Sequence, residues 1–62
     1  MHHYIIVTVN DSPTRSAMND LDSSELVASQ STFICWHINN PSPSDLTTAE
    51  GLAGYLGIVQ ID

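Results

Sequence analysis

The sequence predicts a small α+β domain, in which a single-layer sheet of three to four strands packs with one or two short helices. Two segments, Tyr4–Val9 and Thr32–Ile38, are dense in β-branched and aromatic residues, as is typical of strands. Elsewhere, helix-start signals precede apolar residues at three- and four-residue spacings. A chain of 62 residues has room for one domain, which we assign to residues 1–62.

The segment Thr32–Ile38 is expected to be the central strand, because it holds the only Phe, Cys and Trp of the chain. Side chains alternate along a strand, so residues 34, 36 and 38 share one face and residues 33, 35 and 37 share the other. Both faces are largely apolar, which predicts cover on both sides by helices or by a partner chain. We expect Trp36 to be buried in the core, and Cys35 to be a buried, reduced thiol.

The first strand, Tyr4–Val9, places Ile5, Val7 and Val9 on one face and ends at Asn10, before turn-forming residues. Pro13 suits the first turn of a helix, with Asp11 or Ser12 as its N-cap. A short apolar stripe follows, and this helix is expected to stop near residue 21, where helix-poor residues gather.

The segment Glu25–Ser29 is compatible with a short helix or with a strand. A strand here can pair with Thr32–Ile38 across a tight turn at residues 30–31, and we favour that reading.

The second helix is predicted from Thr47, which forms a capping box with Glu50, although Ser44 or Asp45 offers an alternative start. Apolar residues at helical spacing continue to Leu56, and a stop is expected at residue 57. Residues 58–61 then predict a short final strand.

The charge balance excludes several partners. The chain has one cation, Arg15, against seven acidic residues, which gives a net charge of −6. Neutralisation of nucleic-acid phosphates or attraction to an anionic membrane requires cations, so we expect neither direct nucleic-acid binding nor membrane binding. An acidic field favours a larger protein with a basic surface, including a nucleic-acid-binding one. The predicted partner-binding residues are the acids grouped in the first half of the chain, namely Asp11, Asp20, Asp22 and Glu25.

The small size of the chain predicts self-association or docking on a partner. Chains this short bury little surface and usually gain stability from a disulfide, a metal or another subunit. A single cysteine forms no internal disulfide, so a homodimer or a larger complex is expected.

Chemistry-bearing residues are few. Cys35 and His37 share a strand face, and with His2 or His3 they suggest a small zinc-binding module as one alternative function. Closed zinc sites need about four ligands, and no Cys-x-x-Cys motif is present. No catalytic motif or phosphate-binding glycine loop occurs, and a domain this small is expected to lack a pocket of enzyme size. We therefore predict a non-enzymatic protein without cofactors.

The segment Leu46–Ile58 reads Leu-Thr-Thr-Ala-Glu-Gly-Leu-Ala-Gly-Tyr-Leu-Gly-Ile. It resembles the first helix and turn of helix-turn-helix domains in the excisionase and MerR-like families. The resemblance implies a regulatory protein with a degenerate DNA-binding element, the first alternative, ahead of the zinc-binding module. It stops short of a basic recognition helix, because the chain continues only with Val-Gln-Ile-Asp.

In size, acidity and lack of catalytic motifs, the chain resembles inhibitors encoded by phages and mobile elements, anti-CRISPR proteins among them. That resemblance implies a small acidic inhibitor that blocks a basic surface of a larger protein. The chain begins Met-His-His-Tyr, without a basic region before an apolar run, so we expect a cytoplasmic protein, in the host cell if a phage encodes it.

Overall fold

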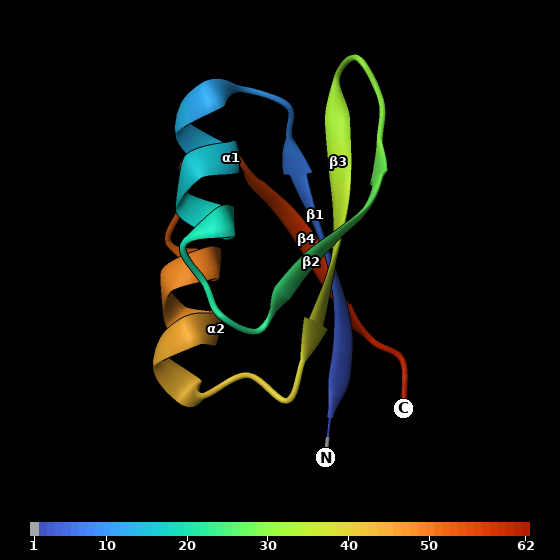
Figure 1. Ribbon diagram of the computed structural model, residues 1–62, viewed down its shortest axis with the longest axis vertical. Coiled ribbons are helices and arrows are strands. Elements are labelled where there is room, and N and C mark those ends of the chain that lie inside the picture. Colours follow the sequence, from blue (N-terminus) through green and yellow to red (C-terminus); the bar gives the residue numbers. More distant parts are fainter. Residues whose placement is uncertain (1) are drawn as a thin grey trace.

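The computed structural model describes residues 2–62, which form one four-stranded antiparallel sheet with two short helices (Figure 1). The predicted α+β fold is confirmed. The elements in chain order are β1 (His3–Val9), α1 (Ser12–Asn19), β2 (Ser24–Ser29), β3 (Phe33–Asn39), α2 (Pro43–Glu50) and β4 (Tyr55–Gln60).

The strands lie in the order β2-β3-β1-β4, so the aromatic strand β3 is central, as predicted. β1 and β3 pair along their whole length, with Ile6 opposite Trp36 and Val7 opposite Cys35. β2 pairs antiparallel with β3, which confirms the strand reading of Glu25–Ser29. In Figure 1 the edge strands β2 and β4 cross the central pair, since the sheet is strongly twisted.

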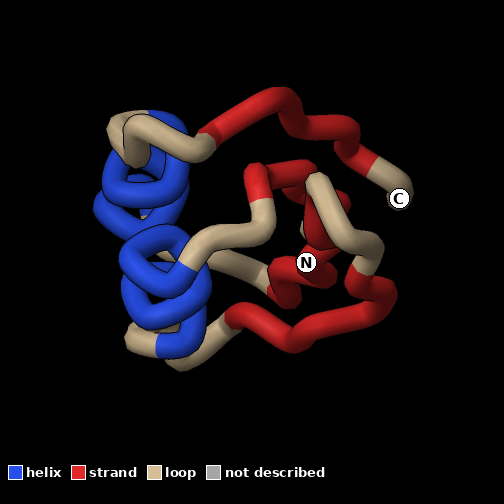
Figure 2. Tube along the Cα trace, turned by 90° about the horizontal axis from the view of Figure 1, so that it is seen from above, coloured by secondary structure: helices blue, strands red, loops and turns tan. Residues whose placement is uncertain are grey.

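Both helices cover the same face of the sheet, and the opposite face has no helix on it (Figures 1 and 2). The prediction of helices on both sides is therefore wrong, and cover of the second face by a partner chain stays a prediction. The buried core between the layers consists of Ile6, Ile34, Trp36 and Ile38 from the sheet with Met18 and Ala49 from the helices.

Trp36 is fully buried, as predicted, and its indole N–H donates to the Thr8 hydroxyl at 2.9 Å. Thr8 is buried too, and its hydroxyl donates in turn to the Val9 carbonyl at 3.1 Å. A buried indole N–H without a partner is costly, so this bond accounts for a threonine in the core.

Helix α1 begins where the sequence predicts. The Asp11 carboxylate accepts from the Thr14 backbone N–H at 2.9 Å, and Pro13 lies in the first turn. The helix ends at Asn19, two residues before the predicted stop near residue 21. The cause is the run of poor helix formers that begins there.

Helix α2 begins and ends earlier than predicted. Its N-cap is Ser42, whose hydroxyl accepts from the Asp45 backbone N–H at 3.2 Å, and Pro43 occupies the first turn. A proline preset to helical φ behind a serine cap is a stronger start than the Thr47 capping box. No helix among residues 2–62 has the length and apolarity to cross a membrane.

The chain after α2 does not form a helix-turn-helix unit. The helix ends at Glu50, and residues 55–60 run as β4, paired with β1. Gly54 packs so closely that a Cβ there would lie 2.6 Å from Val9 Cγ2 and would also meet the Thr14 hydroxyl. Gly54 instead lets the chain enter the sheet beside α1.

Candidate functional site: an acidic groove beside an uncovered sheet face

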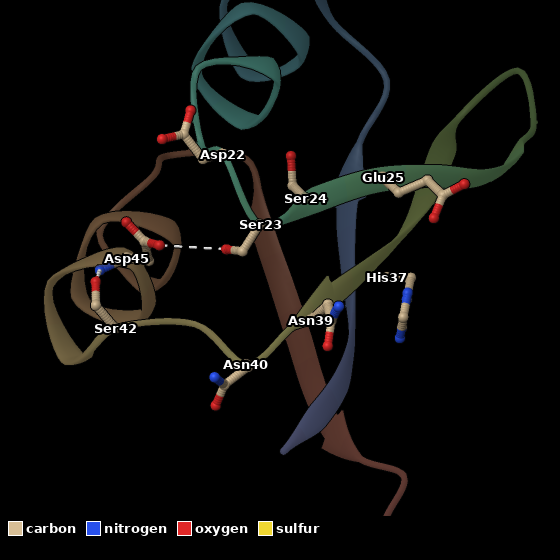
Figure 3. A pocket seen from close by; sticks show the side chains of 9 residues that line it. All are labelled: Asp22, Ser23, Ser24, Glu25, His37, Asn39, Asn40, Ser42 and Asp45. Atoms are coloured by element: carbon tan, nitrogen blue, oxygen red, sulfur yellow. Dashed lines mark hydrogen bonds between the residues drawn. The ribbon is translucent and has the colours of Figure 1, made fainter. Parts of the chain in front are cut away.

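A groove of about 740 Å³ lies where the start of β2, the end of β3 and the start of α2 meet (Figure 3). Its lining contains three carboxylates and no lysine or arginine. The lining residues are Asp22, Ser23, Ser24, Glu25, His37, Asn39, Asn40, Ser42 and Asp45. Its volume falls within the range of ligand pockets, so the expectation that the domain is too small for such a space is wrong.

Each of the three acids reaches the groove from a different part of the chain. Asp22 lies in the turn after α1, Glu25 is the second residue of β2, and Asp45 lies in the first turn of α2. The Asp45 carboxylate accepts from the Ser23 hydroxyl at 3.2 Å, which joins α2 to the start of β2 (Figure 3). Glu25 stands opposite His37 in the β2–β3 register.

The structure brings together only two of the four predicted partner-binding acids, Asp22 and Glu25. Asp20 is exposed at the C-cap of α1 and does not line the groove. Asp11 lies at the opposite end of the same helix, as its N-cap. Asp45 was missed as a site residue; its place near a helix start was visible in the sequence, but its contact with Ser23 depends on the fold.

Asp11 has a structural role. Hydrogen bonds from the Thr14 side chain and backbone N–H hold the pKa of Asp11 below its ordinary value of 3.8. A carboxylate that accepts N–H bonds at a helix N-terminus is stabilised in its charged form. Asp11 therefore caps α1, and it lies outside the lining of the groove.

Ser, His and Asp residues meet in the groove, but their contacts are not those of a catalytic triad. A triad requires the serine to bond the histidine and the aspartate to orient that histidine. Here Ser23 bonds Asp45 directly, while His37 Nε2 faces the Nδ1 atom of His3.

The uncovered face of the sheet begins next to the groove, at His37. By register it presents three aliphatic residues of β1, namely Ile5, Val7 and Val9, flanked by Phe33 and Cys35 of β3 and Val59 of β4. Val59 is 62% exposed and Phe33 is 38% exposed. Cys35 is a free thiol and only half-buried, so the prediction of a buried cysteine is wrong. The reason is that the helices cover the other face.

The imidazoles that the sequence suggested as zinc ligands are divided between two places. His3, rather than His2, meets His37, at 3.0 Å between ring nitrogens. His2 lies beside Gln60 and Asp62. Within residues 2–62 no three His, Cys, Asp or Glu side chains gather closely enough to hold one ion, so no closed zinc site is assembled there.

Comparisons with protein-family models, with curated proteins and with solved structures found no match.

Proposed function

We propose that this protein is a non-enzymatic interaction protein that docks on a basic surface of a larger protein and blocks it. The observation that supports this most is the acidic groove, defined by Asp22, Glu25 and Asp45, lying next to an uncovered apolar sheet face. The two surfaces offer the two components that protein interfaces use, charge for encounter and apolar area for contact.

The charge of the protein determines which partner surfaces it attracts. With a net charge of −6 and one cation in the chain, the field attracts basic surfaces from a distance. The only cation, Arg15, is exposed on α1 and does not line the groove. Three carboxylates without a neutralising lysine or arginine therefore remain available to cationic side chains of a partner.

Apolar contact would come from the uncovered sheet face. Half-buried and exposed apolar residues beside a charged groove resemble the apolar centre and polar edge of a protein interface. The face contains neither lysine nor arginine, the residues that neutralise a phosphate backbone.

The proposed inhibitor would act in the cytoplasm, and in the host cell if a phage encodes it. Blocking a basic, nucleic-acid-binding surface is the task that suits its acidity, and anti-CRISPR and other anti-defence proteins are examples of that class. Dense duplex mimicry is not part of the proposal, because duplex DNA has a charge every 1.7 Å or so of its axis, far denser than this chain provides.

The test compares partner capture by two variants with the same change of charge. The groove variant contains Asp22→Asn, Glu25→Gln and Asp45→Asn. The control neutralises three exposed acids outside the groove, namely Asp20→Asn, Glu50→Gln and Asp62→Asn. Partners captured by wild type from host cells are identified, and association rates are then measured across a salt series.

We expect the groove variant to associate at least tenfold more slowly at low salt, with a smaller change in dissociation, because charges around an interface act on encounter. High salt should erase most of the difference, since screening sets in beyond about 10 Å at 0.1 M. If the groove and control variants slowed association equally, the acidity would be a general solubility property and not a feature of the groove. Direct binding to DNA or RNA would contradict the proposal.

A further inference from the structure

Two histidine side chains from neighbouring strands meet on the uncovered face of the sheet. His3 of β1 and His37 of β3 are half-buried, with His3 Nδ1 and His37 Nε2 3.0 Å apart. The ring planes are parallel within 4° and the ring centroids are 5.1 Å apart. When two rings lie edge to edge, their centroids are separated by the nitrogen–nitrogen distance plus the radius of each ring. The observed centroid separation is close to that sum, so the rings lie edge to edge and share one N–H···N hydrogen bond.

The pair is preorganised by the sheet. The β1–β3 register places His37 opposite Ile5, the residue two positions from His3 on the same face. Diagonal neighbours of this kind are within reach of each other's long or aromatic side chains. Because the residues are 34 positions apart in sequence, the two nitrogens come together only in the folded chain.

The spacing of the nitrogens matches two neighbouring ligands of one metal ion. With metal–nitrogen bonds of about 2.0–2.1 Å, two nitrogens 3.0 Å apart subtend an angle of about 95° at the ion. That angle is close to the right angle of square-planar and tetragonal coordination and well below the tetrahedral angle that zinc prefers.

We propose that His3 and His37 form a two-histidine site for a divalent ion that prefers tetragonal coordination, such as Ni²⁺ or Cu²⁺. The ion takes the place of the shared proton, and both rings turn so that their lone pairs converge on it instead of on each other. No proton needs to leave neutral imidazoles, because His3 can keep its hydrogen on Nε2 and His37 on Nδ1. Water completes the coordination, since no third protein ligand gathers within residues 2–62.

The surroundings favour a cation at this position. Glu25 stands opposite His37 in the β2–β3 register, and both line the acidic groove. Neither lysine nor arginine lines that groove to repel an ion. The site shares His37 and its neighbour Glu25 with the groove, but ion binding is tested at the histidines and partner docking at the carboxylates.

The test uses NiCl₂ as the probe and thermal unfolding as the readout. An ion that binds only the folded chain stabilises it, and at ten times its Kd it raises the folded-to-unfolded ratio about elevenfold. For a domain of this size we expect the melting temperature to rise by several degrees. Calorimetric titration should give one Ni²⁺ per chain.

His3→Gln and His37→Gln should each abolish the shift, whereas His2→Gln, the matched control, should retain it. Circular dichroism without metal checks that each variant is folded. A shift that survives His37→Gln would place the ion at the start of the chain and overturn the proposal. So would no shift in the wild type, or a larger shift with Zn²⁺ than with Ni²⁺.

Discussion

Replacing Thr8 by valine tests whether the buried bond to Trp36 stabilises the fold. Valine keeps the shape of threonine and removes the acceptor, which leaves the indole N–H unpaired in a fully buried position. An unpaired buried donor costs about 1–3 kcal/mol. At about 0.05–0.15 kcal/mol per residue, a 62-residue domain has roughly 3–9 kcal/mol of stability, so the loss is a large fraction of the total.

A double-mutant cycle with Trp36→Phe separates the bond from the side chains that make it. Trp36→Phe removes the donor, so adding Thr8→Val to that background should cost much less than it does in wild type. We expect a coupling free energy of about 1–2 kcal/mol between the two positions. Urea unfolding followed by far-ultraviolet circular dichroism is the assay, because the variant lacks tryptophan fluorescence. Additive effects, or a Thr8→Val variant as stable as wild type, would refute a stabilising role for the bond.

Three further predictions use other parts of the fold. Gly54→Ala should destabilise the protein strongly, because its Cβ would meet Val9 and Thr14, whereas Gly57→Ala, with nothing within 4 Å, should be nearly neutral in the same unfolding assay. Because the pKa of Asp11 is lowered in the folded state, its contribution to stability is present above pH 3.8 and is lost as the pH falls through the lowered pKa. Asp11→Asn keeps a capping oxygen but has no carboxylate to protonate, so its stability should fall less steeply in acid. Identical acid-unfolding curves for the variant and wild type would contradict this. Without a partner, the uncovered face should drive self-association that strengthens with salt, because screening relieves the repulsion between chains of charge −6. Sedimentation that shows a monomer at all salt concentrations would argue against it.

Local spacing in the sequence was sufficient for much of the architecture. The strands β1 and β3, the two faces of β3 and the capped start of α1 depend on neighbours within a few residues, and all were predicted. Pairing of β2 with β3 followed from the short turn between them. The acidity of the surface is a property of composition and needed no fold.

The composition of the groove was decided by the tertiary structure. Asp45 joins Asp22 and Glu25 only because α2 begins at Pro43 and its first turn packs near the start of β2. Contacts between residues so distant in sequence leave no periodic signal. The meeting of His3 with His37, rather than of His2, depends likewise on the β1–β3 register.

The choice of covered face was also made in three dimensions. Alternation shows which side chains share a face, but both faces of β1 are apolar, and the aliphatic row Ile5, Val7 and Val9 is the one left uncovered. The helices cover the face that holds Thr8 and Trp36, where the hydroxyl provides the acceptor that a buried indole requires. Pairing of the strands decides between them: the register places Ile6 opposite Trp36, so burial of this side removes the larger apolar area from water.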